Sequence, residues 1–212
     1  MRRHPETLSF HRGRLPHWEV MAGLYFVTVR LAGSLPNHAV KEIRSMSLRL
    51  QEAEGGELPE RQRQVFRSME KWLDRADTVR YLAIPEIARM IMDAIRHRHA
   101  QRRWRIIEYV IMPNHIHAFL THREKSLKAA VEGFKRWTGH DAAKFIDPKG
   151  KRFWHRECFD RWSRSPEQDD RFIRYIRDNP VKADLVKDYR DWPYGSWADP
   201  EIEKINVEQG HT

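Results

Sequence analysis

Two segments that lie far apart in the sequence carry the side chains best suited to chemistry. One contains the imidazoles of His115 and His117, and the other contains the phenol of Tyr175 and the amide of Asn179. Paired imidazoles can bind a divalent ion, and a phenol can act as a nucleophile. A metal site combined with a tyrosine nucleophile is what the cleavage of DNA through a phosphotyrosine requires.

His115 and His117 lie in a segment that we predict to be a β-strand. Side chains two residues apart on a strand point to the same face, roughly 7 Å apart along it, so both imidazoles can reach one ion. His97 and His99 have the same spacing but fall at the basic end of a predicted helix, where such residues do not face each other. We interpret that second pair as part of a solvated basic patch. For His115 and His117, a pair of hydrogen-bonded structural histidines remains the alternative.

Tyr175 and Asn179 are spaced to lie on one face of a predicted helix, one turn apart. The helix begins with the hydroxyl of Ser165, a proline at its first position and Gln168 three residues past the cap. Pro180 predicts an end at about Asn179, because the residue before a proline disfavours helical geometry. The local pattern by itself favours a plain interpretation, in which the tyrosine is half-buried and the asparagine ends a helix.

The remaining pattern alternates between strands and helices. Strands are predicted at 25–31, 104–112, 115–121 and 153–162. Helices are predicted at 37–67 with a break at 54–56, from Pro85 into the basic run 96–103, at 126–145 and at 165–179. Residues 69–82 are ambiguous. This order predicts an α+β fold with one antiparallel sheet covered by helices.

The chain has 212 residues, enough for a single domain with a substantial core. We expect a basic N-terminal arm at 1–17, one domain at 18–198 with a helical insertion at 37–80, and a flexible tail at 199–212. The sequence offers no role for the insertion.

The charge balance favours an anionic partner. Lys and Arg total 39 against 30 acidic residues, a net charge of +9, which suits nucleic acid, although a charge that serves only solubility is the alternative. No run approaches the ~20 apolar residues of a membrane helix, and no secretory signal is visible. Cys158 is the single cysteine, so no internal disulfide is possible. We expect a cytoplasmic protein that associates with the nucleoid through DNA.

The motifs resemble a known family. Met112-Pro-Asn-His-Ile-His117, followed by Tyr175-Ile-x-x-Asn-Pro-Val-Lys-Ala183, is similar to the tyrosine transposases associated with repetitive extragenic palindromes (REP). These are single-domain relatives of the insertion-sequence 200-like transposases in the His-hydrophobe-His superfamily. The similarity extends to 15–18, 25–30, 134–136, 153–154, 159–160 and 192–196. The chain departs from the family at His155, where glutamine is usual, and at Cys158, where an aromatic residue is usual.

The resemblance implies a ferredoxin-like fold and a role for each motif residue. His115 and His117 match the metal-ligand histidines, Asn179 matches a third ligand, and Tyr175 matches the nucleophile. Nitrogen and oxygen ligands with open positions suit Mg²⁺ or Mn²⁺. The implied activity is a metal-dependent single-stranded DNA endonuclease and strand transferase that acts at palindromic, REP-like hairpins through a 5′-phosphotyrosine. The expected partner is single-stranded or hairpin DNA, bound by a monomer or homodimer.

Several basic residues are candidates for contacts with DNA phosphates, with a solvated charged face as the alternative for each. They are Lys135, Arg136, Arg171, Arg12 and Arg14.

Two other functions stay open. The chain could be a catalytically silent regulator that binds hairpin DNA, or a hydrolase that uses water and does not need Tyr175. The intact set of two histidines, tyrosine and asparagine favours the enzyme.

Overall fold

The computed structural model describes residues 7–12, 16–20, 22–51, 58–75, 79–147 and 152–208. Its strands are β1 (Thr7–Arg12), β2 (Pro16–Val20), β3 (Tyr25–Arg30), β4 (Trp104–Ile111), β5 (His115–His122) and β6 (Phe159–Trp162). Its α-helices are α1 (Asn37–Gln51), α2 (Leu58–Arg75), α3 (Pro85–Ala100), α4 (Leu127–Ala142), α5 (Pro166–Lys182) and α6 (Pro200–Glu208). Within these residues, no helix is long and apolar enough to cross a membrane.

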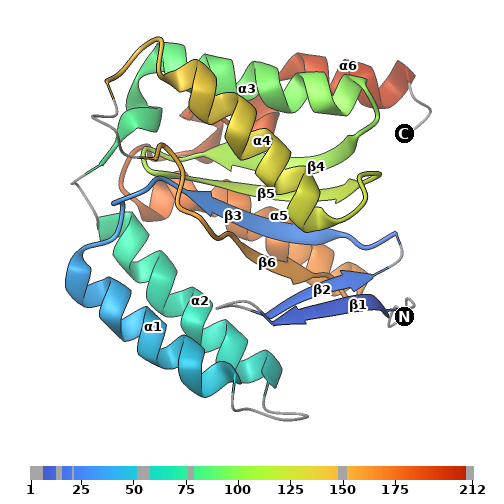
Figure 1. The fold of residues 1–212 in the computed structure, drawn as a ribbon. Coiled ribbons are helices and arrows are strands. Elements are labelled where there is room, and N and C mark those ends of the chain that lie inside the picture. The colour runs from blue at the N-terminus through green and yellow to red at the C-terminus, as the bar shows by residue number, and fades with distance from the viewer. Residues whose placement is uncertain are drawn as a thin grey trace.

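The main sheet has the strand order β4-β5-β3-β6, and every pairing in it is antiparallel. With α3 between β3 and β4, and α4 between β5 and β6, this is the βαββαβ order of a ferredoxin-like fold. The expected fold class is therefore confirmed. Helices α3 and α4 cover one face of the sheet, and α5 lies against the other (Figure 1).

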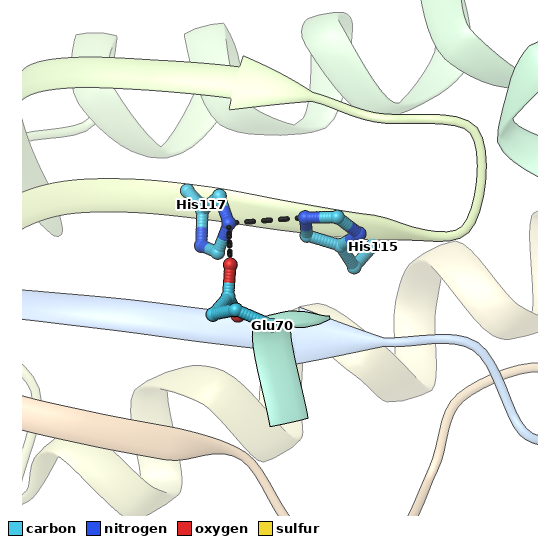
Figure 2. Close-up of side chains that lie close together, drawn as sticks. All are labelled: Glu70, His115 and His117. Carbon is cyan, nitrogen blue, oxygen red and sulfur yellow. Dashed lines mark hydrogen bonds and ion pairs between the residues drawn. The ribbon is translucent and has the colours of Figure 1, made fainter. Parts of the chain in front are cut away.

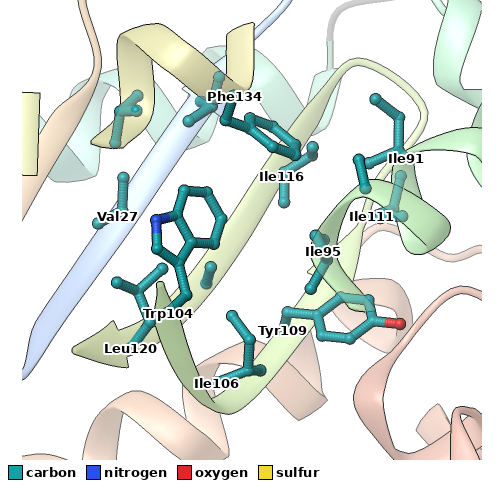
Figure 3. Packing of buried hydrophobic residues seen from close by; sticks show 14 of the residues in the cluster. Val27, Ile91, Ile95, Trp104, Ile106, Tyr109, Ile111, Ile116, Leu120 and Phe134 are labelled. Atoms are coloured by element: carbon teal, nitrogen blue, oxygen red, sulfur yellow. The ribbon is translucent and has the colours of Figure 1, made fainter. Parts of the chain in front are cut away.

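The alternation of side chains along the strands divides the core into two layers. Val27, Ile116 and Leu120 point toward α3 and α4, where the ring of Phe134 also packs (Figure 3). Phe26 and Phe119 point the other way, toward α5. Because side chains on a strand alternate with a period of two, His115 and His117 share this second face with Phe119.

The start of α5 follows its sequence signals, but its end does not. The Ser165 hydroxyl accepts a hydrogen bond from the Gln168 backbone nitrogen, and the Gln168 side chain accepts one from the Arg164 nitrogen. The expected end at Asn179 is wrong, because the helix continues through Pro180 to Lys182. A proline removes one helical hydrogen bond, and here Asn179 and Pro180 are both buried, so packing outweighs the local preference.

The segment 37–80 forms the antiparallel pair α1 and α2, and the break expected at 54–56 lies outside the described residues. Helix α2 buries Met69 and Leu73 against the same face of the sheet as α5. Burial of one such side chain contributes about 1.5–3 kcal/mol. The described part of α2 is thus packed into the fold.

Three further segments differ from the sequence-based expectations. The segment expected as a basic arm contains β1 and β2, which pair as an antiparallel hairpin. The strand expected at 153–162 is present only as β6, with an isolated bridge between Trp154 and Leu31 before it. The tail contains α6, which packs on α3 and buries Ile202, so its described part is ordered by apolar contacts.

A buried carboxylate joins the C-terminal segment to the sheet. Asp199 is 1% exposed. It accepts a hydrogen bond of 2.6 Å from the Tyr109 hydroxyl and one of 2.7 Å from Arg96 Nε.

We predict that Asp199→Ala lowers the free energy of unfolding by about 1–3 kcal/mol, because it leaves the buried Tyr109 hydroxyl without its acceptor. Urea denaturation followed by tryptophan fluorescence measures the change. Glu201→Ala, an exposed acidic residue two positions later, is the matched control and should stay within about 0.5 kcal/mol. Equal stability of both variants and the parent chain would contradict the structural role of Asp199.

Candidate metal and tyrosine site

The two histidines of β5 face each other across a short gap. Their Nε2 atoms are 3.0 Å apart, and both residues are at most 1% exposed (Figure 2). The sequence-based expectation that one strand face carries both imidazoles is therefore met in the structure. His99, by contrast, is buried and uses Nδ1 at 3.2 Å from both the Trp104 carbonyl and the Ile106 nitrogen. The expectation of a solvated patch at the end of α3 is wrong for His99, which supports the turn into β4.

In each of these two histidines, the ring nitrogen that faces away from the other histidine, Nδ1, has a partner of its own. His115 Nδ1 donates to Asn114 Oδ1 at 2.6 Å, and His117 Nδ1 lies 2.9 Å from Thr28 Oγ1. Because an amide oxygen only accepts, the proton of His115 resides on Nδ1 and leaves the lone pair on Nε2. Thr28 lies directly opposite His117 in the β3–β5 register, and its hydroxyl can accept a hydrogen bond from His117 Nδ1 in the same way. Partners of this kind orient metal-binding histidines.

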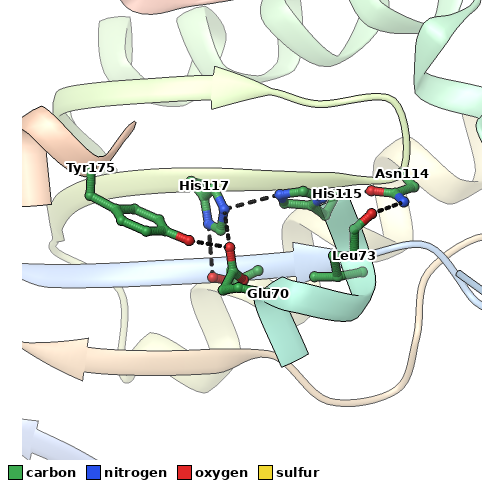
Figure 4. A network of polar contacts seen from close by, with 7 residues as sticks. Glu70, Leu73, Asn114, His115, His117 and Tyr175 are labelled. Carbon is green, nitrogen blue, oxygen red and sulfur yellow. Dashed lines mark hydrogen bonds and ion pairs between the residues drawn. The ribbon is translucent and has the colours of Figure 1, made fainter. Parts of the chain in front are cut away.

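A third side chain enters from α2. Glu70 Oε2 lies 2.9 Å from His117 Nε2 and also accepts a hydrogen bond from the Tyr175 hydroxyl (Figures 2 and 4). One ligand atom from each of Glu70, His115 and His117 lies within 4.8 Å of the other two. A buried Glu-His-His group of this size could hold a metal ion.

Tyr175 and Asn179 both approach this group from α5. The Tyr175 ring packs edge-on against His117, with 5.4 Å between the ring centroids. Asn179 is 1% exposed. Hydrogen bonding with its side chain acts to raise the pKa of His115 and to lower the pKa of Tyr175, against the larger effect of burial at each residue. The helix therefore brings the phenol and the amide to the histidine pair together.

Burial sets the protonation of the group. It lowers the pKa of His115 and of His117 from 6.5 to about 3, with the neighbouring imidazole adding to the effect at His115. Both rings are thus neutral at pH 7, which is the form that binds metals. Burial raises the pKa of Glu70, and burial together with the nearby Glu70 raises the pKa of Tyr175 well above its ordinary value of 10.

Unsatisfied oxygens indicate that these residues fit a divalent cation. Asn179 Oδ1 and Glu70 Oε1 are buried and have no hydrogen-bond partner among the described residues. A buried acceptor without a partner costs about 1–3 kcal/mol, and coordination of a cation is one way in which such an oxygen is satisfied. Two imidazoles, a carboxylate and an amide form a nitrogen and oxygen donor set suited to a divalent ion. A cavity of about 160 Å³ adjoins His115 and extends past Asn114 to Arg75 and Arg80.

The structure does not gather the basic candidates around this group. Lys135 and Arg136 lie on α4, across the sheet from α5, and Lys135 Nζ donates to the Arg156 carbonyl at 2.7 Å. Arg171 is exposed on α5, one turn before Tyr175. The side chain of Arg12 and the whole of Arg14 lie outside the described residues.

The sequence reasoning missed Glu70, although one signal was present. In α2, Phe66, Met69 and Leu73 recur at helical spacing, and Glu70 falls within this apolar stripe. A carboxylate on an apolar helix face needs a buried partner. Because the sequence pattern of residues 69–82 is ambiguous, the sequence alone does not identify this stripe as part of a helix.

Comparisons with known proteins agree with the fold. No family model and no curated protein matches the chain. Among solved structures, it is similar to a REP-associated tyrosine transposase bound to a REP hairpin, with a TM-score of 0.56, 18% identity, and coverage of 97% of this chain and 88% of that one. A candidate transposase from Deinococcus radiodurans aligns with a TM-score of 0.38, 12% identity, and coverage of 81% of this chain and 98% of that one. The chain therefore has the fold of a REP-associated tyrosine transposase, as its motifs indicated.

We predict that His115→Ala lowers the affinity for Mn²⁺ by about 10–100-fold, because it removes one of two converging nitrogen donors. Isothermal titration calorimetry measures the affinity. His97→Ala is the control, since His97 is exposed on α3 and should leave the affinity unchanged. An equal loss in both variants would remove His115 from the site.

Proposed function

We propose that this protein is a metal-dependent single-stranded DNA endonuclease and strand transferase that acts at palindromic hairpins through a 5′-phosphotyrosine. One observation carries the proposal: the Tyr175 hydroxyl and His117 Nε2 contact the same carboxylate oxygen. A candidate nucleophile therefore adjoins the candidate metal ligands. The similar solved structure is bound to a REP hairpin, which supports hairpin DNA as the partner.

In the proposed reaction, the Tyr175 oxygen attacks the phosphorus of a phosphodiester. A bond forms between phosphorus and the phenolic oxygen, and the bond from phosphorus to the 3′ oxygen breaks. The phenolic proton is lost and the departing 3′ oxygen is protonated, which leaves a 5′-phosphotyrosine and a 3′-hydroxyl. The number of phosphodiester bonds is conserved, so attack by a 3′-hydroxyl can reverse the step and join strands.

His115, His117 and Asn179 are the proposed ligands of Mg²⁺ or Mn²⁺. When bound, such an ion withdraws charge from the scissile phosphate. The chain itself positions the nucleophile: α5 carries both Tyr175 and Asn179, so the phenol and the ligand amide move as one unit. Lys182, at the end of the same helix, places Nζ 5.1 Å from the centroid of the Tyr175 ring, where a positive charge favours the phenolate.

Basic residues outside the site are proposed to hold the DNA backbone. Arg171 is the best placed, because it is exposed on α5 one turn before Tyr175. Lys135 and Arg136 would have to contact a part of the DNA that passes α4, on the other side of the sheet.

We predict that Tyr175→Phe abolishes formation of a covalent adduct with single-stranded hairpin DNA but keeps DNA affinity within a few-fold. The substitution removes the nucleophilic oxygen and almost no contact area. A denaturing gel with labelled DNA detects the adduct, and an electrophoretic mobility shift gives the affinity. Cleavage by the Phe variant at the parent rate would favour the water-using hydrolase. Binding with no adduct by the parent chain would favour the silent regulator.

We also predict that Asn179→Leu weakens Mn²⁺ binding by about tenfold, while Asn179→Asp retains it. Aspartate keeps an oxygen at the position of Oδ1, whereas leucine keeps the bulk and loses the oxygen. Calorimetry measures the affinity, and melting curves show whether either variant acts through stability alone. Unchanged affinity in Asn179→Leu would exclude Asn179 as a ligand and leave it a role only in helix packing.

A further inference from the structure

The position of Glu70 conflicts with the reaction proposed above. A scissile phosphate must place one oxygen near the ligand histidines and its phosphorus near the Tyr175 hydroxyl. The Glu70 carboxylate already makes both contacts, since Oε2 bonds to the Tyr175 hydroxyl and lies 2.9 Å from His117 Nε2 (Figure 4). The carboxyl group therefore fills the space that the phosphate needs, whatever its protonation state.

The burial of the site leads to the same conflict. Glu70 is 5% exposed, and the site histidines and Asn179 are at most 1% exposed. A phosphodiester within a DNA strand cannot reach atoms buried to this degree. Glu70 comes from α2, and α2 packs on the face of the sheet that carries the histidines. The conformation described here is therefore closed to DNA, and α2 is an element that closes it.

Separate contacts hold α2 over the site. The Phe66 ring stacks on Phe159 at 4.6 Å and lies 5.6 Å from the Tyr175 ring. The Leu73 carbonyl accepts a hydrogen bond of 2.8 Å from Asn114 Nδ2. Asn114 also orients His115, so the closed position of α2 is linked directly to the metal-ligand pair.

Helix α1 is attached to α2 more closely than to the sheet. Glu42 on α1 accepts hydrogen bonds from Ser68 at 2.7 Å and from Trp72 at 3.3 Å, both on α2. Because these hydrogen bonds join the two helices, a displacement of α2 away from the sheet would carry α1 with it.

We propose that α1–α2 is an autoinhibitory lid, in which the carboxylate of Glu70 occupies the place of the scissile phosphate until hairpin DNA displaces it. This inference rests on the proposed function, because it assumes that the phosphate binds between Tyr175 and the histidines. It gives the insertion at 37–80 a role that the proposed reaction does not need. The proposal also distinguishes two roles for Glu70. If Glu70 were a permanent metal ligand or a general base, its loss would slow cleavage. If Glu70 belongs to a lid, its loss speeds cleavage.

The test compares variants of the lid in the full chain. Glu70→Ala removes the carboxylate, and Phe66→Ala loosens the docking of α2 while keeping every proposed metal ligand. At saturating Mn²⁺, both should raise the initial rate of adduct formation with single-stranded hairpin DNA by about tenfold. Glu86→Ala, an exposed glutamate on α3, is the control and should leave the rate unchanged. A rate lowered in both lid variants would overturn the proposal.

A second measurement does not depend on cleavage. Hydrogen–deuterium exchange of Tyr175→Phe, with and without saturating hairpin DNA, reports whether α2 opens. The lid predicts faster exchange of α2 amides with DNA bound, while α3 amides stay unchanged. Unchanged protection of α2 at saturating DNA would overturn the lid whatever the cleavage result. Opening of α2 together with no adduct from the parent chain or either lid variant would uphold the lid and reject the proposed reaction.

Discussion

The site depends on one constraint: two neutral imidazoles are buried next to each other, and each needs partners for both of its nitrogens. The β3–β5 register supplies Thr28 for His117, and the turn before β5 supplies Asn114 for His115. With the outer nitrogens engaged, the inner nitrogens converge. Burial lowers the pKa of both histidines to about 3, so this arrangement persists at neutral pH without competition from protons.

The elements around this pair contribute in different ways. Helix α5 brings a phenol and an amide on successive turns, so its position against the sheet determines both at once. That position is secured by apolar contacts, since the Phe172 and Phe26 rings stack at 4.9 Å and Ile176 is fully buried. The ion pair between Arg177 and Glu108, with 2.7 Å between the charged groups, joins α5 to β4. The Tyr175 phenol is therefore positioned by packing, and none of the site residues is held by a flexible loop.

Helix α2 contributes a carboxylate that has two possible effects on the same chemistry. As a donor, it completes a Glu-His-His group that can hold a cation. As the hydrogen-bond acceptor for the phenol, it holds Tyr175 in its protonated, unreactive form and fills the space beside it. These effects are compatible if the closed form stores the ion and the open form admits DNA. The orphaned oxygens of Glu70 and Asn179 are consistent with a group that is completed by a cation.

The sequence by itself determined what depends on local spacing. A period of two placed His115 and His117 on one strand face, a period of four placed Tyr175 and Asn179 on one helix face, and the order of elements indicated the antiparallel sheet. Local signals failed where packing outweighed them, as at Pro180, where α5 continues because the residue is buried. They also failed in the tail, where Ile202 and Asp199 find partners on distant elements.

Only the tertiary structure decided which charged residues join the site. Glu70 lies 45 positions before His115 in the chain, and nothing in the spacing of the two indicates that they meet. Its place is set by the docking of α2 through Met69 and Leu73, a contact between helix and sheet that no local period encodes. Lys135 and Arg136 lie on α4, which packs on the opposite side of the sheet. Local periodicity shows which face of its own element a side chain occupies, but the packing of elements determines which faces meet.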